Sequence, residues 1–207
     1  VQSVMMVIPV IAVAINQHMT VVGNFRALLY SPTLRFVVLG AMMYTLASLQ
    51  GSLESLRSVN TVTHFTHFTV AHAHLGLYGF FSMVMFGAIY FIMPRIMDWE
   101  WPYPRLISLH FWLVVAGFAV YFVALTVGGW LQGLALLDAQ RPFMESVPLT
   151  IPYLEARPLG GSLMTLGHLV FALHFFLMGW RFGPRRLGAA LLGPAGFRAK
   201  AAAGGAL

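Results

Sequence analysis

Residues Ala71-His-Ala-His-Leu-Gly76 open a run of about 20 apolar residues that ends near Met93, the length of a membrane span. Polar side chains at membrane depth are costly, and by default they mark a functional site. Neighbouring residues of a helix are about 100° apart, so His72 and His74 lie on nearly opposite sides of it. They cannot easily share one metal, but each can bind a different one. The spacing predicts a helix between two cofactors, and haem, whose iron takes a proximal histidine, fits best.

An alternative interpretation is that both histidines are buried and bonded to neighbouring helices, but this leaves their opposite directions without a purpose. The composition indicates an integral membrane protein, because 59% of the residues are hydrophobic and only 9% are charged, against about 25% charged in soluble domains. The absence of cysteine excludes disulfides, thiolate metal sites and cysteine nucleophiles. We interpret the net charge of +6 as a sign of membrane topology rather than of nucleic-acid binding.

Five apolar segments are long enough to cross a bilayer. They are residues 1–18, 34–55, 69–93, 106–136 and 161–180. We therefore predict an all-α integral membrane protein, a bundle of about five transmembrane helices, with a kink at Pro9 in the first. The membrane unit is expected over residues 1–186, followed by a disordered cytoplasmic tail over residues 187–207. Because the chain begins at Val1 inside an apolar run, we expect further helices upstream of it.

The basic residues are distributed unequally over the predicted loops. One side has Arg26, Arg35, Arg95, Arg105 and the five basic residues after the last span, and the other side has Arg57, Arg141 and Arg157. This asymmetry predicts a cytoplasmic C-terminus and places His72 and His74 in the outer half of the membrane. The proline-rich connection over residues 138–160 is then predicted to form a cap on the outer face.

Other polar residues have less specific interpretations. His64 and His67 lie at the predicted outer boundary, where they could bond haem propionates, ligate a small cation or simply contact water. Gln50 lies at the depth of His72 and could accept its second imidazole N–H. Tyr44, Ser48 and Ser52 share one helix face, which favours interhelical hydrogen bonding over a water path. Glu54, the only acid near a predicted span other than those in the loops, is given no role.

The remaining histidines are expected to be structural. His168 is predicted to be a bonded histidine inside the bundle. It does not form one site with His174, because the two are far apart around their helix. His18 and His110, near the cytoplasmic ends of their helices, are expected to be interfacial.

Together these motifs carry a resemblance to a known family. The stretch over residues 63–79, Thr-His-Phe-Thr-His-Phe-Thr-Val-Ala-His-Ala-His-Leu-Gly-Leu-Tyr-Gly, resembles the His-x-His helix of haem–copper oxidase catalytic subunits. Further stretches make the chain most similar to the C-terminal half of subunit I of cbb3-type cytochrome c oxidases. They are Asn24-Phe-Arg-Ala-Leu, Tyr30-Ser-Pro-Thr-Leu-Arg-Phe, the segment 50–60 and Gly128-Gly-Trp-Leu-Gln-Gly133. The likeness extends to about Arg186.

The resemblance implies a twelve-helix subunit in a bacterial inner membrane, of which these would be the last five helices. His72 would bind the iron of the high-spin haem b, where oxygen reacts, and His74 that of the low-spin haem b. The copper ligands and the redox tyrosine would lie in the upstream helices, outside this chain. Where the family pattern has a glutamate before Gly51, this chain has Gln50, so the resemblance implies a proximal imidazole with less imidazolate character.

The activity implied is reduction of oxygen to water with electrons from cytochrome c, coupled to proton translocation in aerobic respiration. The implied partners are the upstream helices and membrane-bound cytochrome c subunits. The related nitric oxide reductase large subunit shares the Thr-x-Ala-His-x-His-Leu pattern and is an alternative, as is a non-catalytic membrane protein that binds haem or metal. Because each haem finds at most one ligand here, the chain alone is expected to be inactive.

Overall fold

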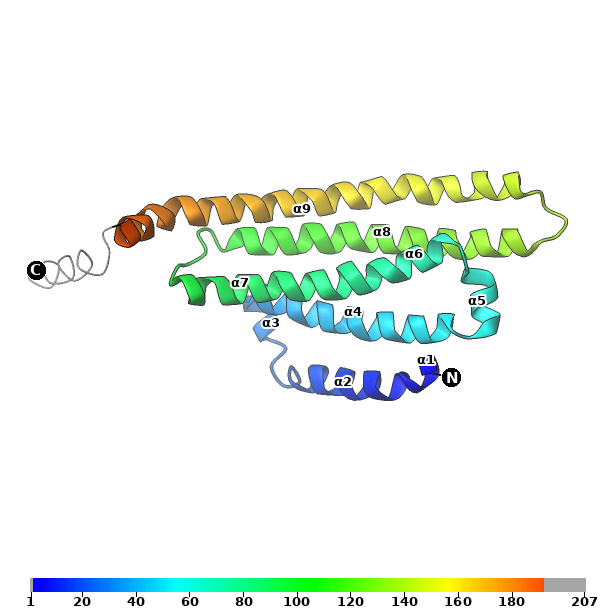
Figure 1. Cartoon of the computed structure of the whole chain (residues 1–207), viewed down its shortest axis with the longest axis horizontal. Helices are drawn as coiled ribbons and strands as arrows, with labels where there is room; N and C mark the ends of the chain where they lie inside the picture. The colour runs from blue at the N-terminus through cyan, green and yellow to red at the C-terminus, as the bar shows by residue number, and fades with distance from the viewer. Residues whose placement is uncertain (1, 192–207) are drawn as a thin grey trace, which may run out of the picture.

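The computed structural model describes residues 2–191, with side chains as far as Arg181, and within that range it contains helices and turns but no strand. The helices are α1 Gln2–Met5, α2 Val7–Met19, α3 Ala27–Tyr30, α4 Pro32–Glu54, α5 Arg57–Thr63, α6 His67–His74, η1 Leu75–Ser82, α7 Met83–Met97, α8 Arg105–Leu137 and α9 Phe143–Leu191. The long helices lie side by side in chain order, each running back along the one before it (Figure 1). The all-α bundle predicted from the sequence is confirmed.

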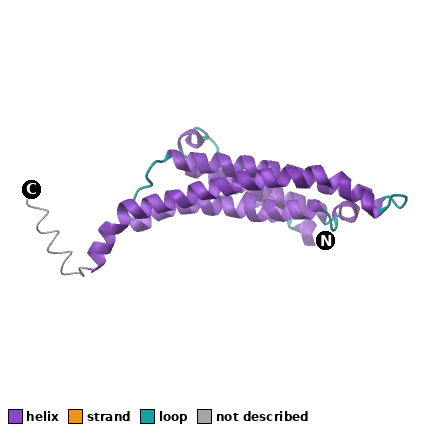
Figure 2. Ribbon diagram, turned by 90° about the horizontal axis from the view of Figure 1, so that it is seen from above, coloured by secondary structure: helices purple, strands orange, loops and turns teal. Residues whose placement is uncertain are grey.

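Five helical stretches are long and apolar enough to cross a membrane. They are Gln2–Met19, Pro32–Glu54, His67–Met97, Arg105–Leu137 and Phe143–Arg181. The third joins α6, η1 and α7 into one rod, and seen from above the spans form an elongated bundle (Figure 2). The predicted segments fall within or within a residue or two of these helices, because hydropathy over a window of membrane length is the strongest signal in the chain.

Proline affects the first and the last span differently. Pro9 cannot donate a hydrogen bond to Met5, and the helix is interrupted at Met6, between α1 and α2, as the sequence predicts. The prediction that residues 138–160 form a separate cap is wrong beyond residue 142. There α9 begins at Phe143 and continues through the prolines of this stretch.

Two hydroxyl groups bond the backbone in the first turns of α9. The Ser146 hydroxyl donates to Phe143 O at 2.7 Å, and the Thr150 hydroxyl donates to Val147 O at 2.8 Å. Neither carbonyl is one that a proline of α9 leaves without its N–H donor, so these bonds support the turns without replacing the bonds that the prolines remove. At its other end α9 extends to Leu191, so the first residues of the predicted tail 187–207 are helical, and the rest of that tail lies outside the described residues.

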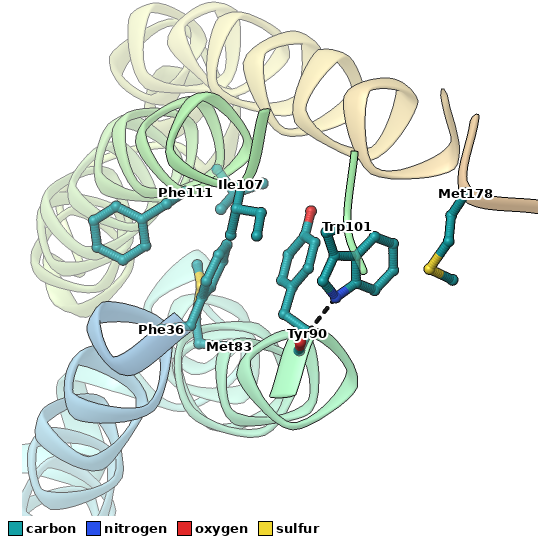
Figure 3. Close-up of a cluster of buried hydrophobic side chains, with 8 residues drawn as sticks. Phe36, Met83, Tyr90, Trp101, Ile107, Phe111 and Met178 are labelled. Carbon is teal, nitrogen blue, oxygen red and sulfur yellow. Dashed lines mark hydrogen bonds between the residues drawn. The ribbon is translucent and has the colours of Figure 1, made fainter. Parts of the chain in front are cut away.

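A buried aromatic cluster closes one end of the bundle, beside the loop between α7 and α8. It contains Phe36, Met83, Tyr90, Trp101, Ile107, Phe111, Val114 and Met178 (Figure 3). The Trp101 indole N–H donates to Tyr90 O at 2.8 Å and ties this loop to α7. The cluster therefore joins four of the five spans at one end, while the histidine motif lies toward the other.

Glycines let the backbone of α8 approach its neighbours closely. A Cβ added at Gly129 would lie 1.9 Å from Phe68 N, and one at Gly133 would lie 1.9 Å from Val62 O. On the other side of α8, a Cβ at Gly117 would lie 2.6 Å from Gly160 O. These contacts fix the start of α6, and hence the histidine motif, against α8.

We expect Gly129→Ala to destabilise the bundle by about 1–3 kcal/mol or more, because the new methyl collides with backbone rather than with a side chain that can move. The measurement is the thermal midpoint of the membrane protein in detergent. Gly179→Ala is the matched control, since nothing lies within 4 Å of its Cβ position on α9. Equal midpoints for the two variants would contradict the close contact between α6 and α8.

Candidate functional site

The two histidines lie at a change of helix type. The hydroxyl of Thr66 accepts the Phe68 N–H at 3.2 Å and caps α6 at its N-terminus. Directly after His74 the chain turns into the π-helix η1. Such segments are rare and occur frequently at functional sites, because they re-aim side chains without breaking the helix. The local structure thus holds His72 and His74 between a defined cap and a widened turn.

His72 faces α4. A Cβ at Gly51 would lie 3.0 Å from His72 Cε1 and 3.2 Å from His72 Nε2, so any larger residue there would require the ring to shift. His72 Nδ1 lies 3.9 Å from Glu54 Oε1, and both atoms are buried without a hydrogen-bond partner among the described residues. His72 also lines a cavity of about 430 Å³. The rest of the cavity wall comes from Ser3, Met6, Val10, Tyr44, Ala47, Ser48, Gly51, Ser52, Gly76 and Phe80.

His74 leaves the helix on the side of α8. Its Nδ1 lies 2.8 Å from Val70 O, and since a carbonyl can only accept, Nδ1 carries the proton. In the neutral ring Nε2 is then an acceptor, and it lies 3.2 Å from the Tyr121 hydroxyl. Tyr121 also lines an open cleft of about 710 Å³ between α8 and α9, together with Arg157, Pro158, Gly161, Ser162, Thr165 and Leu166.

The two imidazoles therefore point to different neighbours, as their spacing predicts. Each has a nitrogen that can bind a metal while the other nitrogen faces an acceptor, the arrangement usual for ligating histidines. The residues on each side are compatible with a haem in one respect each. The glycine and cavity beside His72 leave space, and the bond to Val70 O fixes the tautomer that His74 needs. Within residues 2–181 no group of three histidine, aspartate or glutamate side chains could hold a metal ion.

The structure places the other predicted residues as follows. Gln50 is half-buried with Oε1 unpartnered among the described residues, and the acidic group beside His72 is Glu54, one turn further along α4. His64 is exposed and its ring lies 3.9 Å from that of Phe65. His67 begins α6 and its backbone N–H donates to Gln132 Oε1 at 3.0 Å. Their proposed roles at the cofactors remain predictions.

Sequence reasoning gave Glu54 no role, although its position could have shown it. Glu54 follows Gln50 by one helical turn, so both share a face, and the carboxylate reaches further toward the end of the span. Tyr44, Ser48 and Ser52, assigned to interhelical bonding, also line the cavity beside His72. The Ser52 hydroxyl additionally bonds Ser48 O at 2.9 Å.

Two histidine predictions have clear outcomes. His168 is bonded within the bundle, 2.9 Å from the Tyr78 hydroxyl, as predicted. The prediction that His110 is interfacial is wrong, because its side chain is 0% exposed and Nδ1 lies 3.0 Å from the Tyr90 hydroxyl. The prediction rested on the position near a helix end, but Phe36, Phe86 and Phe171 from three other helices pack on the His110 ring. His18 is half-buried and donates through Nδ1 to Ala14 O.

Residues 1–163 match the family model described as cytochrome c and quinol oxidase polypeptide I. The chain belongs to this family. One similar curated member is the cytochrome c oxidase subunit 1 homologue, bacteroid, of Bradyrhizobium diazoefficiens, which is 32% identical over 84% of this chain and 33% of its own length. Another is cytochrome c oxidase subunit 1 of Rhodobacter capsulatus, which is 33% identical over 85% of this chain and 34% of its own length.

A further member of the oxidase family is the cbb3-type subunit CcoN1 of Stutzerimonas stutzeri, which is 32% identical over 83% of this chain and 39% of its own length. The chain thus spans about a third of the length of the curated relatives it matches. Its fold is similar to that of a solved haem–copper terminal oxidase dimer, with a TM-score of 0.60 and 18% identity over 79% of this chain and 31% of the other. The family is multi-pass and these relatives are bacterial.

Proposed function

We propose that the chain is the haem-binding C-terminal part of a cbb3-type oxidase subunit of twelve helices, placed in a bacterial inner membrane. The complete subunit would reduce oxygen to water with electrons from membrane-bound cytochrome c subunits, coupled to proton translocation. The observation that carries the proposal is the pair His72 and His74. They lie on one helix and point to different neighbours, each with a cavity or cleft nearby.

His72 is proposed to bind the high-spin haem b and His74 the low-spin haem b. The Nε2 atom of His72 lies against Gly51, at the wall of the smaller cavity. The Nε2 atom of His74 lies on the side of the larger cleft, where Arg157 and Ser162 could meet acidic haem substituents. When bound, haem iron supplies the redox chemistry, and its axial ligands and their partners set the potential.

The chain's own part is to orient these ligands and to exclude water. The bond from His74 Nδ1 to Val70 O holds the tautomer in which Nε2 carries the lone pair, and a haem iron bound there would take the place of the Tyr121 hydroxyl. Glu54 is proposed to play the corresponding role at His72 Nδ1, with Gln50 one turn away. His64 and His67 are proposed to contact haem propionates at the end of the third span. Copper would be bound by the upstream part of the subunit.

The decisive test compares His72→Ala with His74→Ala in the complete subunit within its assembled complex. His72→Ala should remove the high-spin signal that responds to carbon monoxide and leave most of the low-spin spectrum. His74→Ala should do the opposite. Reduced-minus-oxidised spectra with and without carbon monoxide measure this on protein shown to be folded and inserted.

His18→Ala is the matched control, because it removes a half-buried histidine that bonds only its own helix, and it should keep both signals. Loss of both haems in His72→Ala or in His74→Ala would contradict the assignment of one haem to each face. An exchange of the two spectra would show that the faces are reversed.

A second prediction concerns Glu54. Glu54→Gln should raise the midpoint potential of the haem at His72 by roughly 60 mV or more, since a carboxylate donates more electron density through the imidazole than an amide does. Gln50→Glu should lower the same potential. Redox titration followed optically gives both values, and Glu155→Gln, an exposed acid on α9, is the control. Equal shifts of both haems would count against a contact at His72.

The third prediction concerns topology. The uneven distribution of basic residues predicts that the C-terminus lies in the cytoplasm. A phosphatase that is active only in the periplasm should therefore be inactive when fused after Leu207, and a cytoplasmic reporter there should be active. The opposite pattern would reverse the orientation and move His72 and His74 to the inner half of the membrane.

A further inference from the structure

Five proton-carrying side chains outside the proposed haem ligands form a series along η1, α7, α8 and α9, three of them buried and two, His168 and Tyr78, half-buried. They are His174, Tyr90, His110, His168 and Tyr78. The series begins under the loop between α7 and α8 and ends in η1, near His74. No part of the proposed ligation uses these residues, and each of the five rings contacts at least one phenylalanine or tryptophan ring.

The series begins at His174, whose side chain is 0% exposed. His174 Nε2 bonds Pro102 O in the loop, and because a carbonyl only accepts, Nε2 carries the proton. In the neutral ring Nδ1 then carries the lone pair, and this atom is buried with no partner among the described residues. The His174 ring lies 5.9 Å from that of Tyr90, centroid to centroid. Exposed Tyr103 and Arg105 lie close by in the chain, so water reaches this end.

Tyr90 and His110 form the middle of the series. The Tyr90 ring rises from α7 between Ile107 and Trp101, with its hydroxyl directed toward α8 and α9 (Figure 3). That hydroxyl lies 3.0 Å from His110 Nδ1, and His110 Nε2 is buried without a partner in the described part of the chain. If the Tyr90 hydroxyl donates to His110 Nδ1, the ring proton is on Nε2, which is then a donor without an acceptor. If the hydroxyl accepts from Nδ1, Nε2 carries the lone pair and is an acceptor without a donor. Both arrangements leave a nitrogen open toward the next group.

His168 is the next group, and its ring centroid lies 6.3 Å from that of His110. Gly167 allows the approach, since a Cβ there would lie 3.4 Å from His110 Cδ2 and only 2.6 Å from Val114. His168 Nε2 lies 2.9 Å from the Tyr78 hydroxyl. One turn before His168, Thr165 lines the cleft that also includes Tyr121, the partner of His74 Nε2.

We propose that this series is a proton relay between the loop that joins α7 to α8 and the cleft beside His74. In one transfer, His110 accepts a proton at Nε2 from the His168 side and releases its Nδ1 proton to the Tyr90 hydroxyl oxygen. Tyr90 passes its own hydroxyl proton to the lone pair of His174 Nδ1, and His174 releases its Nε2 proton at the loop. Proton number is conserved, and each ring resets by moving to its other tautomer. The proposed relay includes one water between His110 and His168, since the buried Nε2 of His110 has no other partner in the described part of the chain.

The alternative is that these pairs only join the helices, as polar bonds do in many membrane bundles. Pairwise joining accounts for the bonds Tyr78–His168 and Tyr90–His110. It does not account for the open nitrogens of His110 and His174, which lie at the two gaps of the series where a transfer needs them. The relay stands on these contacts alone and does not depend on whether haem binds His74.

The test is exchange of the His110 ring N–H with deuterated buffer. It uses the complete subunit in its assembled complex, labelled with ¹⁵N-histidine and placed in lipid, and the signal of His110 is the one lost in His110→Gln. A relay makes this fully buried proton exchange quickly. The double variant Tyr90→Phe/His168→Leu closes both sides and should slow exchange at least about tenfold. Loosened packing would speed exchange, so damage to the fold cannot imitate this result.

Phe171→Leu is the matched control, because Phe171 packs on Tyr90 and His110 but carries no proton. This variant should keep the fast exchange, and Tyr90→Phe alone, which preserves the ring, should slow it in part. Slow exchange in the unsubstituted protein, or an unchanged rate in the double variant, would overturn the relay. Optical spectra of the same samples report on haem separately, so a failure of the haem assignment is seen independently.

Discussion

The contact of α8 with the chain around residues 62–68 is the constraint on which the arrangement of the histidines depends. With hydrogen atoms in place of side chains at Gly129 and Gly133, the backbone of α8 lies against Phe68 N and Val62 O. A helix held this closely cannot rotate, so the directions of His72 and His74 are set by backbone contacts rather than by flexible side chains. The same contact places Tyr121 within reach of His74.

The two histidines differ in how firmly their second nitrogen is held. His74 bonds a carbonyl of its own helix, a contact that any helix of this sequence would make. His72 depends on α4, because Gly51 and Glu54 both belong to that helix. A shift of α4 would therefore alter the surroundings of His72 and leave the tautomer of His74 unchanged. The electronic properties of the two sides are thereby set by separate parts of the fold.

Most of the fold could be predicted from the sequence, because the spans are long uniform apolar stretches and His72 and His74 have a simple angular relation. The rest depends on contacts that no local pattern records. The prolines over residues 138–160 predict a loop, but α9 continues through three of them, as helices of membrane proteins are able to do. The prediction for His110 was wrong because its burial depends on Phe36, Phe86 and Phe171, which belong to other helices. Glu54 was passed over because its partner lies on another helix.

The π-helix η1 separates the third span into two parts with independent rotational settings. Each i→i+5 turn takes one residue more than an α-turn, so η1 changes the angular phase of α7 relative to α6. The direction of His72 and His74 is fixed before this segment, and that of Tyr90 after it. An insertion or deletion of one residue within η1 would turn one half by about 100° and leave the other in place. The length of η1 therefore fixes the orientation of the histidine-bearing part of this helix relative to the part that packs in the aromatic cluster.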